Sequence, residues 1–218
     1  MKQKTQRQAR ETLVERYQGL GLPNFEVHAL SKKIHFLQRK WDGNDSTSKM
    51  AGTTYKAFMV EVGMYGNIFS RAWEEFNVLA TKHTWYYNLW ELCHRLDVEL
   101  EVDEKYHNKP VRQGDRSIIN VAIEKGCRNK TLESINVVRK HLNLIHLSDL
   151  VHCDGRTLLD NLLEAYGQLA TKMTFPKEKP TRNDKSLWRQ FLDTLTDDRN
   201  MLLEPLGEYV SLTHAKMD

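Results

Sequence analysis

The 218-residue chain is long enough for one large domain or two small ones, each with a hydrophobic core. Its 40% hydrophobic and 28% charged residues are typical of a soluble globular protein. No apolar run approaches the roughly 18 residues of a membrane span, and the polar N-terminus lacks a signal peptide's apolar stretch. Three widely spaced cysteines argue against a disulfide framework, so we expect an intracellular protein of the nucleus or cytoplasm, with no membrane partner.

The net charge of +3 is distributed in blocks of alternating sign. Residues 1–40 carry nine Lys or Arg against three Glu, and residues 106–140 carry eight against three acidic residues. The segments 41–105 and 141–218 have an acidic excess. Two basic surfaces would suit a polyanionic partner, but Lys and Arg also solvate helix faces in proteins without one. The charge pattern leaves both interpretations open.

The first half of the chain predicts three helices. The best defined follows Pro23, where apolar residues recur at spacings of three and four: Val27, Leu30, Ile34, Leu37 and Trp41. Polar residues 42–52 predict a turn-rich connector, and further helices are expected over 67–80 and 85–96. In the last of these we expect Trp85 and Trp90 in the core, with the neighbouring tyrosines at its edge.

The second half also favours helices. Thr131 is expected to cap a helix that reaches about His141, and Thr157 to Asp160 matches a capping box for a helix ending at Gly167. A linker over 174–184 then precedes a last helix over 186–195. We therefore expect an all-α or mostly α fold, a helical bundle with long connecting loops and room for a short β-hairpin. Its segments are 1–45, 46–105, 106–170 and 171–218.

Two motifs resemble the region that follows the polymerase core in LINE-type (non-LTR) retrotransposon reverse transcriptases. Residues 19–25 read Gly-Leu-Gly-Leu-Pro-Asn-Phe and lead into the helix that ends in Trp41. The family has Gly-Gly-Leu-x-Leu-Pro-Asp/Asn-aromatic here, so Gln18 departs from the pattern. Residues 133–167 resemble a second element, a basic helix that leads to an Asp-Leu segment, an Asp-Gly turn and a helix closing Tyr-Gly. Asn143 stands where the family often has Gly, and Asn tolerates left-handed geometry.

The resemblance implies a non-catalytic, thumb-like C-terminal region that positions RNA template and DNA primer, with an upstream polymerase domain as a further partner. A polymerase needs paired carboxylates that hold two metal ions. The one adjacent pair, Asp197-Asp198, follows a predicted helix and reads as a turn. His141, His146, His152 and Cys153 are too loosely spaced for a structural zinc site. We therefore expect no catalytic residue, no metal and no cofactor in this chain.

Nucleic-acid binding would use basic helix faces that contact phosphates. The candidates are Arg7, Arg10, Arg16, Lys32, Lys33, Arg39, Lys40, Arg128, Lys130, Arg139 and Lys140, with Arg112 and Arg116 beside the second group. The cluster of Trp85, Tyr86, Tyr87 and Trp90 offers rings for stacking on bases, although a core role is the commoner one. The alternative is a helical protein-interaction or scaffold protein without a nucleic-acid role.

Overall fold

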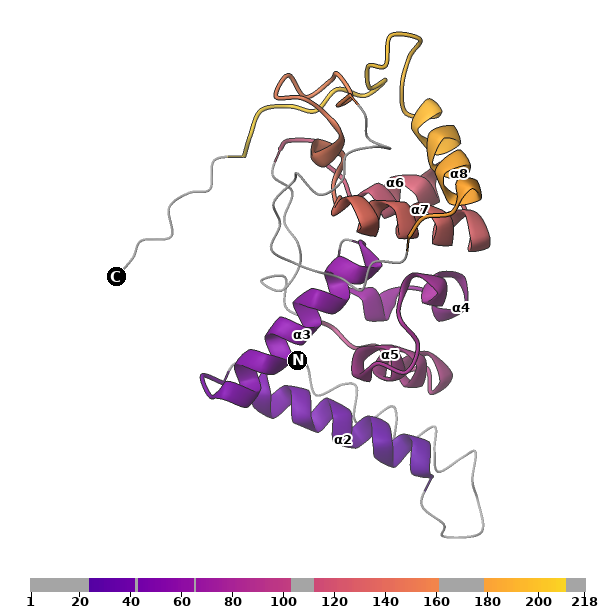
Figure 1. Ribbon diagram of the computed structural model, residues 1–218. Helices are drawn as coiled ribbons and strands as arrows, with labels where there is room; N and C mark the ends of the chain where they lie inside the picture. Colours follow the sequence, from indigo (N-terminus) through magenta and orange to yellow (C-terminus); the bar gives the residue numbers. More distant parts are fainter. Residues whose placement is uncertain (1–23, 42, 65, 103–111, 161–178, 211–218) are drawn as a thin grey trace, which may run out of the picture. The chain divides into compact units, whose positions relative to one another are not determined.

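The computed structural model describes residues 24–41, 43–64, 66–102, 112–160 and 179–210 (Figure 1). These residues form seven α-helices joined by loops and short 3-10 turns, which confirms the mostly helical fold. Within the described ranges β structure is limited to isolated bridges, and the allowed β-hairpin is not among them. No helix in the described part of the chain is both long and apolar enough to cross a membrane. The chain divides into two compact units, residues 1–59 with 66–107 and residues 60–65 with 108–218.

In the first unit, helix α2 (Phe25–Lys40) packs against helix α5 (Trp85–Arg95) (Figure 1). Helix α3 (Ser46–Val62) contributes its N-terminal part, where the Ala51 carbonyl accepts a 2.8 Å hydrogen bond from the Tyr86 hydroxyl. The core of this unit is aromatic because Tyr55, Tyr86 and Trp90 are all buried there.

Two expectations for this unit were wrong, one about where a helix begins and one about which side chains are buried. Helix α3 begins inside the predicted 42–52 connector, since Asp45 Oδ1 accepts from the Ser48 amide at 2.9 Å and so caps the first turn. In α5 the tyrosines Tyr86 and Tyr87 are buried, whereas Trp85 is only half-buried. The tyrosines are therefore core residues and Trp85 lies at the edge.

The helix expected over 67–80 is broken into three short pieces. They are the 3-10 turn η1 (Ile68–Ser70), helix α4 (Trp73–Phe76) and the 3-10 turn η2 (Asn77–Leu79). Arg71 is extended, and its carbonyl accepts a 3.1 Å hydrogen bond from Trp90 Nε1. In a continuous helix this carbonyl would accept from the amide four residues later. The bond from Trp90 satisfies it instead.

In the second unit, helix α7 (Asn129–Leu142) packs against both α6 (Ile118–Glu124) and α8 (Arg182–Asp193) (Figure 1). The Ser134 hydroxyl donates a 2.6 Å hydrogen bond to Asp184 across the α7–α8 contact. Helix α7 starts two residues before Thr131 and ends at Leu142, close to the expected His141. The next residue, Asn143, has a φ of 58°, a left-handed geometry that Asn tolerates.

The capping box expected at Thr157 was wrong. Thr157 forms a β-bridge with Met201, and its hydroxyl and amide both donate to the Asp154 carboxylate. The rest of the expected helix, from 161 to Gly167, lies outside the described residues. A capping box does form at Thr181 and Asp184, so α8 begins four residues earlier than the sequence predicted. The 3-10 turn η4 (Leu147–Leu150) completes the unit.

Candidate nucleic-acid interface

Helix α2 carries four of the basic candidates, and it follows the Gly-Leu-Gly-Leu-Pro segment of the sequence. Its start is fixed by Asn24, whose side-chain oxygen accepts from the amides of Glu26 at 3.0 Å and Val27 at 3.3 Å. Leu30 and Leu37 are buried and attach the helix to its unit. These anchors determine which of the remaining side chains point outward.

Two of the four basic candidates on α2 are engaged within the protein. The Lys33 ammonium lies 4.3 Å from the centre of the Trp85 ring and donates to the Trp85 carbonyl at 3.4 Å, and burial lowers the pKa of Lys33. Lys40 forms a 2.9 Å ion pair with Asp45. Hydrogen bonding to Lys40 lowers the pKa of the Asp45 carboxyl to about 2. Lys33 and Lys40 therefore serve α2 first as anchoring residues.

The other two candidates, Lys32 and Arg39, lie on one exposed stripe of α2 together with His28 and His35. Their spacings of four, three and four place the four residues within an arc of about 60° on the helix surface. Within the described part of the chain, no ion pair engages Lys32 or Arg39. We call these four residues the α2 stripe.

No carboxylate lies on this face of the helix. The one acidic residue of α2, Glu26, is on the opposite side and forms an ion pair with Arg95 of α5. The α2 stripe is thus a purely basic surface in a unit whose following segment is acidic. Such a surface attracts anions.

The second group of candidates is mostly engaged in structural contacts. Arg139 is only 1% exposed and donates to the carbonyls of Glu61 and Leu144, so in this conformation it presents no surface to nucleic acid. The Arg128 guanidinium donates to the carbonyls of Ile123 and Cys127, both at 2.8 Å.

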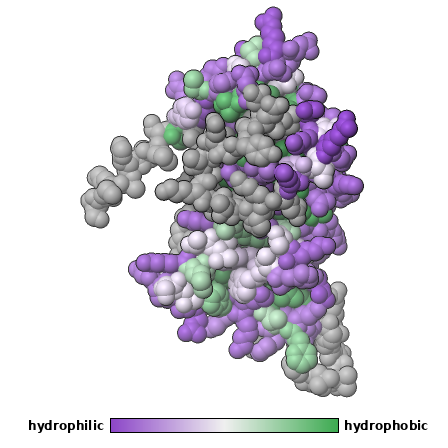
Figure 2. Space-filling model, viewed as in Figure 1, coloured by the Kyte–Doolittle hydropathy of each residue, from purple (hydrophilic) through white to green (hydrophobic). Residues whose placement is uncertain are grey.

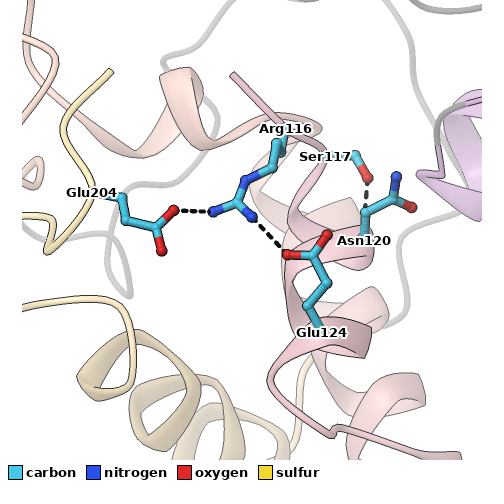
Figure 3. A network of polar contacts seen from close by, with 5 residues as sticks. All are labelled: Arg116, Ser117, Asn120, Glu124 and Glu204. Carbon is cyan, nitrogen blue, oxygen red and sulfur yellow. Dashed lines mark hydrogen bonds and ion pairs between the residues drawn. The ribbon is translucent and has the colours of Figure 1, made fainter. Parts of the chain in front are cut away.

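The neighbouring arginines are engaged as well. Figure 3 shows that Arg116 lies between Glu124 and Glu204, at 2.6 Å and 2.7 Å from their carboxylates. To its right in Figure 3, Ser117 caps α6 by accepting from the amide of Asn120. Arg112 is buried and donates to the Gly207 carbonyl at 2.9 Å. In the described part of this basic block, residues 112–140, the four arginines therefore make internal contacts.

Of the remaining candidates, Lys130 is exposed at the start of α7 and Lys140 is half-buried near its end. Lys130 lines a hollow of about 450 Å³ with Ser134 and Asp184, and it lies near the Asp184 carboxylate. Arg7, Arg10 and Arg16 lie outside the described residues.

The catalytic and metal-binding alternatives receive no support from the geometry. Asp197 accepts from the amides of Arg199 and Met201, both at 2.9 Å, so the Asp197-Asp198 pair belongs to a turn, as the sequence predicted. Among the described residues no group of three His, Cys, Asp or Glu side chains is placed to hold a metal ion.

His28, His35 and the exposed Phe25 lie on the same surface as Lys32, although they were not among the predicted contact residues. Their helical spacing indicates this shared face, because they recur at intervals of three and four beside the apolar stripe. The predicted contacts were Lys and Arg side chains alone.

Comparisons with protein-family models, with curated proteins and with solved structures found no match to this chain.

Proposed function

We propose that the α2 stripe binds the phosphate backbone of nucleic acid, and that the chain positions RNA template and DNA primer beside an upstream polymerase domain. The second part of this proposal comes from the resemblance to LINE-type reverse transcriptases. The observation that carries the first part is the exposure of Lys32 and Arg39 on a helix face without a carboxylate.

The arrangement suits backbone contacts better than base reading. Lys32 and Arg39 are seven residues apart on one side of α2, which corresponds to about 10 Å along the helix axis. Flexible cationic side chains in such a row contact successive phosphates and carry no sequence information themselves. We therefore expect binding with strong salt dependence and little sequence preference.

The test is the affinity of the full chain for a fluorescently labelled RNA–DNA hybrid, measured by anisotropy over a series of salt concentrations. In the double variant Lys32→Gln, Arg39→Gln, the slope of log affinity against log salt should fall by about 1.8, since each lost phosphate contact removes about 0.9. The wild-type affinity should decrease steeply between low and physiological salt.

The matched control is the double variant Lys49→Gln, Lys56→Gln on α3, which removes the same charge from two exposed positions of the first unit. It should leave the slope almost unchanged. If both double variants lower the slope equally, binding reflects net charge and not the α2 stripe. If the wild type does not bind at low salt, the proposal fails and the scaffold alternative is favoured.

A further inference from the structure

Two phenylalanines of α2 lie in water beside the α2 stripe. Phe25 is 81% exposed and Phe36 is 38% exposed, although rings of this size are usually buried. Figure 2 shows hydrophobic side chains among hydrophilic ones along α2. An exposed ring at the first residue of a helix contributes little to folding, and what matters here is that it shares one face of α2 with a second ring and two cations.

The phenylalanines interleave with the two free cations. Phe25, Lys32, Phe36 and Arg39 fall within an arc of about 60° on α2, and the two rings are about 16 Å apart along the axis. Phe36 is held in place, since its ring meets Trp85 edge to face at 5.8 Å and Lys33 lies over the same indole. The face therefore alternates rings and positive charges.

We propose that this face takes an unpaired nucleic-acid strand, with phosphates on Lys32 and Arg39 and bases stacked on Phe25 and Phe36. This inference rests on the proposed function and specifies its substrate as single-stranded. In a duplex the faces of the bases are covered by their neighbours, so exposed rings gain little from it. In an unpaired strand each base offers a free face, and stacking is tolerant of sequence.

The two positive charges on this face favour a nucleic-acid strand over an apolar protein partner. A protein groove that buried Phe25 and Phe36 would also have to bury or pair Lys32 and Arg39, at a desolvation cost. A nucleic-acid strand supplies a negative group for each cation and a flat apolar surface for each ring. The absence of a carboxylate from this side of α2 removes repulsion along the whole face.

The experiment compares two labelled oligonucleotides of equal length with the full chain, one of oligothymidine and one with the same phosphodiester backbone but abasic sites throughout. The base-bearing strand should bind at least about fivefold more tightly, the lower end for one stacked base. Phe25→Ala should remove most of that difference and leave the affinity for the abasic strand unchanged. Phe36→Leu keeps most of the packing volume against Trp85. Combined with Phe25→Ala, it should reduce the difference in affinity between the two strands further.

Met50→Ala is the matched control, because Met50 is 65% exposed on α3 of the same unit. It should change neither affinity. Equal binding of the two strands by the wild type overturns the stacking proposal and leaves the phosphate contacts standing. Binding of neither strand, while the RNA–DNA hybrid binds, overturns the single-strand proposal alone, and binding of neither strand nor hybrid overturns the proposed function itself. Phe25-dependent binding to vesicles of anionic phospholipid, with no preference between the strands, assigns the rings to a lipid surface and also overturns stacking.

Discussion

The guanidinium of Arg139 lies directly against Gly63, at a position where any side chain would collide with it. Gly63 has a φ of +70°, and Arg139 donates to the carbonyls of Glu61 and Leu144 on either side of this contact. Burial lowers the pKa of Arg139 to about 9, so the group remains positively charged at neutral pH. The chain after α3 is thus shaped around one buried cation.

Replacing Gly63 with Ala should destabilise the protein strongly. A Cβ there adds a steric collision with Arg139 to the cost of a left-handed backbone, which is about 1 kcal/mol or more by itself. Gly126→Ala is the matched control, since Gly126 has a φ of +85° but open space around it. The free energy of unfolding from urea titration should be clearly lower for Gly63→Ala than for Gly126→Ala. Equal losses would show that Arg139 moves aside at no cost.

Arg139→Lys should unfold or severely weaken the protein, because a lysine cannot donate to two carbonyls in a fixed fork and its amine would lose its hydration in a buried site. The expected loss in the free energy of unfolding is about 3 kcal/mol or more. Arg128→Lys is the control, since Arg128 also donates to two carbonyls but is exposed to water. Its loss should stay below about 1 kcal/mol. A stable Arg139→Lys with weakened nucleic-acid binding would restore Arg139 as a contact residue.

Stability should fall as the pH drops below about 6.5, because His146 is buried in a form that resists protonation. Burial lowers the pKa of His146 below its usual 6.5, opposed by Asp149 and Asp115 and assisted by Arg139. The unfolded chain therefore binds a proton at a higher pH than the folded one. The contribution of His146 to stability is fully present above the pKa that it has in the unfolded chain. It is lost as the pH falls toward the lower pKa that His146 has in the folded protein.

The measurement is urea unfolding at several pH values between 5 and 8. His146→Gln should flatten the decline below about 6.5, whereas His152→Gln, at an exposed histidine of the same unit, should keep it. A decline of the same size in His146→Gln would place the responsible group elsewhere.

Ser134 and Asp184 should show a measurable coupling between α7 and α8. Asp184 accepts from the Ser134 hydroxyl at 2.6 Å and also forms the capping box with Thr181. Ser134→Ala should cost about 1 kcal/mol, and Asp184→Ala should cost more because it also removes the carboxylate that accepts from Thr181 in the capping box. A double-mutant cycle read by thermal or urea unfolding isolates the shared bond. Strict additivity of the two losses would mean that the bond contributes nothing net.

Helix positions were predicted correctly where the neighbouring residues alone decide the backbone conformation. Apolar spacing located α2, and the sequence placed the end of α7 at about His141, one residue before the observed Leu142. The wrong boundaries arose where a distant partner intervened. Trp90 donates a hydrogen bond to the carbonyl of Arg71, at a point where the predicted helix is interrupted. Thr157 forms a β-bridge with Met201 and is therefore extended and not the cap of a helix. No window of neighbouring residues contains those partners.

The sequence by itself determined the mostly helical fold class, the position of α2, its basic character and the alternating charge, because periodicity and composition act over a few residues. The tertiary structure decided which cations remain available. Lys33 is engaged by Trp85, 52 residues away, and Arg139 by Glu61, 78 residues away, whereas Lys32 and Arg39 stay in water. A charged side chain becomes structural when folding brings it a buried partner, and that partner is set by long-range packing.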